Sequence, residues 1–152
     1  TPAKGPAEYV AAVRKSNCIY FAHPVFTQYH NNAPLWCKTL VANALNMLLP
    51  DPVVKASGPS TAQFSLNAQN DESRLVLHAL HYIPERRGRD FDIIEDVIPI
   101  YDVHVSVAID KEVTAVNLVP RVEQLQFKQA DGRVEFVIPR INGHEMVEIR
   151  WA

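Results

Sequence analysis

The stretch Val103-His104-Val105-Ser106-Val107-Ala108-Ile109-Asp110 decides the fold, because branched apolar residues stand at every second position. This period is typical of a β-strand that has one face in a core and the other outside it. Runs of the same period lie on both sides of it, in the segments 62–68, 75–80, 116–118, 125–127, 134–138 and 147–151. About seven short strands at such spacing predict an antiparallel β-sandwich.

The segments between these runs differ in kind. Asp131-Gly132 and Asn142-Gly143 each separate two strands, and Asn, Asp and Gly tolerate positive φ, so we predict a β-hairpin at each. The connection from Pro84 to Ile100 is long and charged. Because long loops in compact domains are often functional or make interfaces, we expect it to be the contact loop of the β-domain.

The first fifty residues follow another pattern. Pro6 to Val13 predicts a short helix, and Cys18 to Ala22 is a continuous apolar run that predicts a buried strand. A second helix is expected after a cap at Asn32 or Ala33, with Pro34 near its first position and Pro50 beyond its end. Its predicted anchors are Leu35, Trp36, Leu40 and Val41.

A single buried strand needs neighbours on both sides, and this segment supplies none. We therefore interpret residues 1–50 as a helix-strand-helix remnant, the end of an α/β domain, and residues 51–152 as a separate β-sandwich domain. Otherwise the first segment docks on the β-domain or on another subunit. We expect it to expose an apolar face when isolated, which favours association and a homo-oligomer.

Composition limits the classes of function. Apolar residues make up 47% of the 152 residues, enough for a folded core. The net charge of −2 argues against a nucleic-acid partner, which would require a basic face. No run approaches the ~18 apolar residues of a membrane span, and no signal-peptide pattern is visible. Since the chain begins at Thr1 rather than Met, removal of an upstream signal or domain stays open.

The two cysteines, Cys18 and Cys37, are most simply small buried hydrophobic residues in the predicted strand and helix. A disulfide between them and a reactive thiol are the alternatives. The sequence has no CxxC pair, which argues against a zinc ribbon, and we predict no metal site.

The sequence gives only weak indications of a set of catalytic residues. The long connection contains three acidic residues, Glu85, Glu95 and Asp96. They could provide a catalytic carboxylate pair, or they could neutralise the charge of the neighbouring arginines, and we favour the second interpretation. His78 and His81 should face opposite sides of a strand, and His104 could approach one of them. The sequence has no GxSxG motif and no phosphate-binding glycine pattern, so we predict no catalytic residue and no cofactor.

Histidines, aromatic residues and arginines are candidates for binding. His23 and His30 flank a segment after the predicted buried strand, where α/β sheets place their ligand crevice. Tyr82 and Trp151, with Tyr101 and Phe91, could stack on sugar rings, although aromatic residues are mostly buried. The guanidinium groups of Arg86, Arg87 and Arg89 could bind an anion or form salt bridges.

Several segments resemble a known family. Ile19 to Phe26, Ala33 to Lys38 and Ala44 to Pro50 resemble the end of the glutamine-amidotransferase-like, flavodoxin-like domain that follows the catalytic barrel in some β-galactosidases and related glycoside hydrolases. That domain is called the trimerisation domain in such β-galactosidases. Further segments of this chain resemble the C-terminal β-domain of those hydrolases. They are Leu75 to Arg87, Ile94 to Pro99, Val103 to Val107 and Phe136 to Val147.

The resemblance implies a non-catalytic accessory and oligomerisation region, a fragment of a bacterial glycoside-hydrolase-like protein acting in carbohydrate metabolism. In that family the catalytic acid and nucleophile belong to an N-terminal (β/α)₈ barrel, so the implied partner is a catalytic domain absent here. The location implied is cytoplasmic or exported to the periplasm. One alternative is a carbohydrate-binding module, which requires exposed Tyr82, Tyr101 and Trp151. Another is a small independent enzyme, which requires His78, His104 and a carboxylate to converge.

Overall fold

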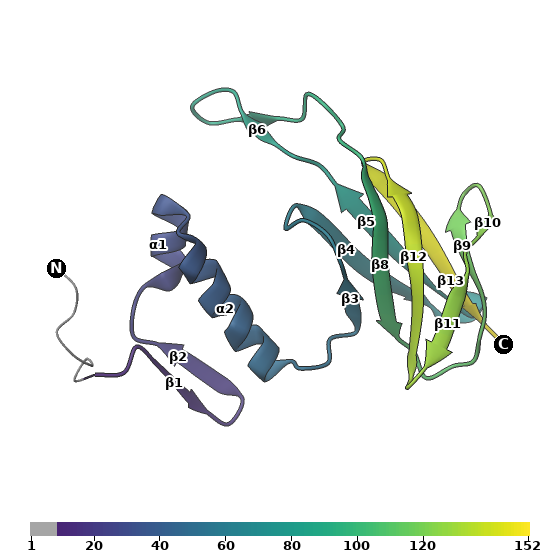
Figure 1. Ribbon diagram of the computed structural model, residues 1–152, viewed down its shortest axis with the longest axis horizontal. Coiled ribbons are helices and arrows are strands. Elements are labelled where there is room, and N and C mark those ends of the chain that lie inside the picture. The colour runs from purple at the N-terminus through teal and green to yellow at the C-terminus, as the bar shows by residue number, and fades with distance from the viewer. Residues whose placement is uncertain (1–8) are drawn as a thin grey trace. The chain divides into compact units, whose positions relative to one another are not determined.

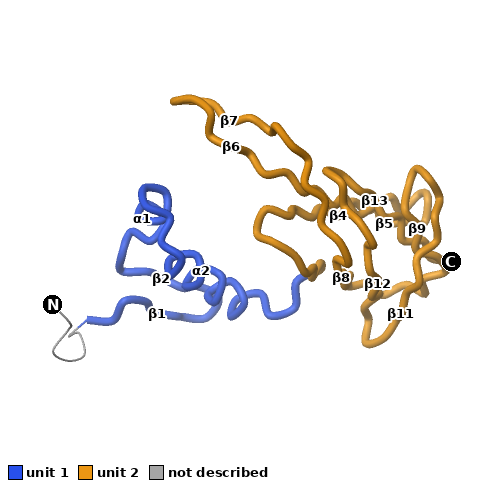
Figure 2. The backbone as a smooth tube through the Cα atoms, turned by 45° about the horizontal axis from the view of Figure 1, so that its top comes forward, with its two compact units in different colours: residues 1–52 blue, residues 53–152 orange. Residues whose placement is uncertain are grey.

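The computed structural model describes residues 9–152. The chain divides into two compact units, residues 1–52 and residues 53–152 (Figure 2). Antiparallel sheets dominate the described residues, which contain two α-helices. The mainly β class predicted from the alternating pattern is therefore confirmed.

The first unit contains a hairpin followed by two helices (Figure 1). Strands β1 (Ala12–Lys15) and β2 (Cys18–Phe21) pair antiparallel, and helices α1 (Val25–Asn32) and α2 (Leu35–Leu48) follow. The limits of α2 agree with the prediction, because Pro34 precedes it in an extended conformation and Pro50 lies just beyond it. The predicted cap is wrong: Asn32 ends α1, and Ala33 closes that helix in the left-handed region.

The start of this unit also differs from the expectation. Of the helix predicted over Pro6 to Val13, residues 6–8 lie outside the described residues, and Val13 belongs to β1 instead. Val13 pairs with Tyr20 across the hairpin, where a β-branched residue fits well. The strand at Cys18 was predicted correctly, but its burial was not, because a two-stranded hairpin covers neither face and Tyr20 is exposed.

The second unit contains two main sheets (Figure 1). The five-stranded sheet has the order β10 (Glu123–Gln124), β9 (Val113–Val119), β13 (His144–Trp151), β5 (Arg74–His81) and β4 (Ala62–Gln69). The four-stranded sheet has the order β11 (Phe127–Ala130), β12 (Arg133–Ile141), β8 (Ile100–Ala108) and β3 (Val54–Ala56). All pairings are antiparallel, and a 3₁₀ turn, η1 (Asn70–Glu72), links β4 to β5.

The apolar sides of the two sheets form one core. Because side chains alternate along a strand, the inward-facing residues of β5, β8, β9, β12 and β13 form it. Burying each such side chain contributes about 1.5–3 kcal/mol relative to leaving it exposed. The fully buried members include Leu77, Val107, Val116, Leu118, Val134, Ile138, Val147 and Ile149.

The two turn dipeptides have different roles. Asp131 and Gly132 both have positive φ (52° and 71°) and join β11 to β12 as a hairpin, as predicted. Asn142-Gly143 does not form a hairpin, because β12 and β13 belong to different sheets. Gly143, with φ of 79°, turns the chain from the four-stranded sheet to the five-stranded one. Local sequence predicts the turn, whereas strand partnership depends on the whole sandwich.

Candidate functional site

The long connection between β5 and β8 forms an arm, defined here as residues 83–98. Two short strands, β6 (Glu85–Arg86) and β7 (Asp92–Ile93), pair antiparallel within it, and the arm projects from the sandwich (Figure 1). At its bend, Phe91 lies so close to Gly88 that a Cβ there would come within 2.2 Å of the ring. The arm is therefore an ordered projection rather than an irregular loop.

Ion pairs cross the arm and account for its charged residues. Arg86 Nε lies 2.7 Å from Asp92 Oδ1, and Arg87 binds the carboxylates of both Glu85 and Glu95. The guanidinium groups of Arg86 and Arg87 thus already have anionic partners within the chain. This arrangement agrees with charge balance and argues against a catalytic carboxylate pair at these positions.

Apolar side chains of the arm are exposed. Phe91 is 59% exposed, although an aromatic ring of this size usually gains from burial. A set of exposed apolar side chains in one segment marks an interaction surface more often than chance exposure does. The members of this apolar arm surface are Ile83, Phe91, Ile93, Ile94, Val97 and Ile98.

His81 holds the end of the arm against the sandwich. Its side chain, only 2% exposed, has Nδ1 2.9 Å from the carbonyl oxygen of Ile98 and Nε2 3.0 Å from Oγ1 of Thr61. One imidazole therefore links β5, the arm and the connection that precedes β4. As predicted, His81 and His78 face opposite sides of β5, since His81 is buried and His78 is on the outer face.

The predicted aromatic binding residues do not share a surface. Tyr82 follows β5 and packs against Gly143, whereas Trp151 ends β13 and packs against the core. Because β5 and β13 are antiparallel with His144 opposite Leu80, Tyr82 and Trp151 lie at opposite ends of the sheet. Tyr101 is 60% exposed but belongs to the other sheet, where Arg140 lies over its ring. No common sugar platform forms from these three residues.

The remaining predicted histidines are also separated. His23 precedes α1 and His30 lies in its last turn, so both are exposed at opposite ends of one helix rather than flanking a loop. His78 is on the outer face of the five-stranded sheet, and His104 is on the outer face of the four-stranded sheet. The convergence of His78 and His104 that an independent enzyme would require is therefore contradicted.

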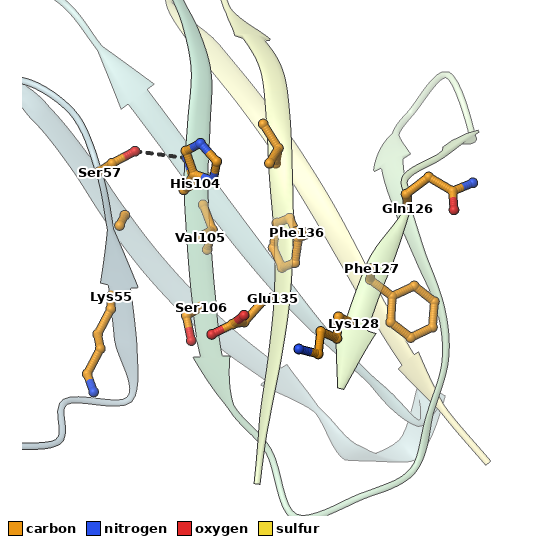
Figure 3. Close-up of a pocket in the computed structure, with 12 residues that line it drawn as sticks. Lys55, Ser57, His104, Val105, Ser106, Gln126, Phe127, Lys128, Glu135 and Phe136 are labelled. Atoms are coloured by element: carbon orange, nitrogen blue, oxygen red, sulfur yellow. Dashed lines mark hydrogen bonds between the residues drawn. The ribbon is translucent and has the colours of Figure 1, made fainter. Parts of the chain in front are cut away.

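The outer face of the four-stranded sheet carries a groove of about 860 Å³ (Figure 3). Ser57 Oγ accepts a hydrogen bond of 2.8 Å from the backbone N–H of His104. The groove is not predictable from the sequence, because the polar positions of the alternating strands mark an outer face but not which strands share it. Its polar lining residues are Lys55, Ser57, His104, Ser106, Gln126, Lys128 and Glu135.

A charged cluster occupies the outer face of the five-stranded sheet. Glu148, with a side chain 8% exposed, lies 3.0 Å from Arg150 and 2.8 Å from Arg74. The hydrogen bond from Arg150 lowers the pKa of Glu148, burial opposes this effect, and Arg74 and Asn117 add to the lowering. The same contact raises the pKa of Arg150. Because Glu148 is paired with both arginines, we interpret the cluster as one that stabilises the sheet rather than one that binds a ligand.

Helix α2 leaves most of its apolar side chains uncovered. Cys37 and Ala44 are its buried members, whereas Trp36 is 54% exposed. Leu35 and Trp36 therefore do not anchor the helix as predicted, although the expected apolar exposure of this segment is present. A small apolar cavity of about 270 Å³ lies between α1 and α2, lined by Val25, Phe26, Tyr29, Cys37, Lys38, Val41, Ala42 and Leu45.

The two cysteines differ in burial. Both cysteines are free; Cys37 is buried as predicted, but Cys18 is exposed because the hairpin leaves it uncovered. Within residues 9–152, no group of three or more His, Cys, Asp and Glu side chains is placed to hold a metal ion. In the same range, no helix has the length and apolar character needed to cross a membrane.

A solved structure places this architecture in context. The α-L-fucosidase isoenzyme 2 from Paenibacillus thiaminolyticus matches with a TM-score of 0.87 and 32% sequence identity over 93% of this chain. This chain resembles part of a glycoside hydrolase. The match covers 22% of the fucosidase chain, so the described fold corresponds to about a fifth of that enzyme. No protein-family model matches the chain, and comparison with curated proteins gives no match either.

Proposed function

We propose that this chain is a non-catalytic accessory and association region of a glycoside-hydrolase-like protein. The observation that carries the proposal is the match to 22% of a bacterial α-L-fucosidase across 93% of this chain. On this view the acid and nucleophile of the hydrolase belong to another part of the protein. An α-L-fucoside is the first substrate to test with the whole protein, and the 152-residue chain alone should hydrolyse none.

Two exposed apolar surfaces support the association role. One is on the helices, where Phe26, Leu35 and Trp36 are exposed, and the other is the apolar arm surface. Covering apolar area on association contributes roughly 25 cal/mol per Å², so both surfaces favour contact with another domain or subunit. The proposed partners are the catalytic domain of the same protein and a second copy of the chain.

Solution mass tests the association role. Light scattering during size exclusion should give a dimer or larger species for the unmodified chain. Substitutions Leu35→Ser and Trp36→Ser together should shift the mass towards the monomer, because both side chains are exposed and their loss should not disturb folding. The matched control is Val122→Ser, which removes an exposed apolar side chain of the β-domain that belongs to neither surface. A monomeric parent chain would refute self-association.

Carbohydrate binding is the second candidate, and the groove of Figure 3 favours it. Its volume lies in the range of small-molecule sites, about 300–1,000 Å³, and its polar side chains suit sugar hydroxyls. Calorimetric titration with neutral and acidic oligosaccharides would test this role. Binding that is lost in a His104→Ala, Lys128→Ala variant would support the groove, and no heat with any sugar would argue against it.

A further inference from the structure

Two histidines meet on the outer face of the five-stranded sheet. Nδ1 of His78 lies 3.1 Å from Nε2 of His144, and the rings are nearly parallel, with an interplanar angle of 13°. The strand register explains this contact. His144 pairs with Leu80, so His78 and His144 are diagonal neighbours on one face of β5 and β13, within reach of long side chains.

A methionine shares this corner of the sheet. Met146 stands directly opposite His78, and it follows His144 by two residues, so all three side chains project from the same face. Glu148, two residues beyond Met146 on the same face of β13, is bound by Arg74 and Arg150. On the other side of His78, the partner in β4 is Ser65. The corner therefore gathers two imidazoles and a thioether without a competing charge.

This set of donors is suited to a transition-metal ion. In a metal site, each imidazole nitrogen lies about 2.0–2.1 Å from the ion. If the nitrogen–metal–nitrogen angle lies between a right angle and the tetrahedral angle, the two nitrogens are separated by roughly 2.9–3.4 Å. The observed 3.1 Å falls within this interval. Imidazole binds divalent zinc, nickel and copper, and a thioether favours copper, above all Cu(I).

We propose that His78, His144 and Met146 form a surface site for a first-row transition-metal ion, with copper as the preferred ion. Both imidazoles bind through the nitrogens that face each other, so each ring keeps its proton on the other nitrogen. Met146 supplies a soft third ligand. The site uses two strands that the sandwich core already holds in register, so metal binding requires no change of fold.

The test is metal titration of the 152-residue chain in a Cys18→Ser background, which removes the exposed thiol as a competing ligand. Calorimetry with NiCl₂ and CuSO₄ measures the divalent ions, and competition with a chromophoric Cu(I) chelator measures Cu(I). His78→Gln and His144→Gln should each weaken Ni²⁺ binding at least about tenfold, because a two-point chelate becomes a single contact. His104→Gln, an exposed histidine of the other sheet, is the matched control and should change nothing.

Met146→Leu separates the role of the thioether. It should weaken Cu(I) binding at least about tenfold while leaving Ni²⁺ binding nearly unchanged. Circular dichroism melting of every variant establishes that the sandwich is intact. Equal metal affinity in the parent, His78→Gln and His144→Gln chains would overturn the proposal, and so would a loss in His104→Gln as large as that in His78→Gln. A loss of Ni²⁺ binding confined to the His78 and His144 variants would support it.

Discussion

His81 offers a quantitative test of how the arm is fastened. Replacing it by alanine removes both hydrogen bonds of the imidazole, to the carbonyl of Ile98 and to the hydroxyl of Thr61, from a side chain that is 2% exposed. Each hydrogen bond contributes about 0.5–1.5 kcal/mol net, and the lost ring leaves a cavity. We expect the free energy of unfolding to fall by about 2–4 kcal/mol.

Two companion variants locate the effect. Thr61→Val removes one of the two partners and should cost about 1 kcal/mol. His104→Ala is the control, because that side chain is exposed and its loss should stay within about 0.5 kcal/mol. Urea unfolding followed by circular dichroism gives the energies.

Hydrogen exchange then tests where the structure loosens. Amides of β6 and β7, the paired strands of the arm, should exchange faster in His81→Ala, while those of β12 and β13 keep their relative protection. An unchanged unfolding midpoint together with unchanged exchange in β6 and β7 would refute the view that His81 fastens the arm.

Three further predictions concern the sandwich. The pKa of Glu148 is lowered in the fold, so its ionised carboxylate stabilises the folded chain fully above the ordinary pKa of about 4.3. This stabilisation should be lost as pH falls through the lowered pKa. Urea midpoints measured against pH should show the loss in the parent chain and not in Glu148→Gln. Gly143→Ala should lower the melting temperature more than Gly132→Ala does. Both glycines have positive φ, but only a Cβ at Gly143 would meet a neighbour, the Tyr82 hydroxyl at 2.7 Å. Equal decreases in melting temperature would contradict this packing. Ile149→Ala should cost about 2–5 kcal/mol by chemical unfolding, whereas a loss under about 1 kcal/mol would mean that Ile149 is not in the core.

The first unit shows where local patterns mislead. The run from Cys18 to Ala22 is apolar on both sides, which is typical of a buried strand. In the structure it pairs only with β1, and Tyr20 is exposed. The pattern of apolar residues shows which side chains of a segment can be buried, but it does not show which other element covers them. The exposed face of this unit is therefore consistent with the proposed association role.

The candidate surfaces were predicted unevenly. The length and charge of the segment Pro84 to Ile100 predict a contact loop, a role that stays a prediction, whereas its hairpin and exposed apolar side chains are visible only in the structure. Tyr82 and Trp151 are both predicted as candidates for stacking on sugar rings, yet they lie at opposite ends of a sheet. The groove of Figure 3 combines residues from four strands, and no local signal gives that combination.

Local sequence is enough to predict the alternation of Val103 to Ile109, the mainly β class, the helix that ends before Pro50 and the turn at Asp131-Gly132, because each depends on neighbours within a few residues. It does not predict which strands pair, that Asn142-Gly143 joins two sheets, or that His78 meets His144 across 66 positions of sequence. These features depend on long-range contacts, because strand pairing is chosen by the joint burial of both sheets in one core. Local propensity carries no information about that choice.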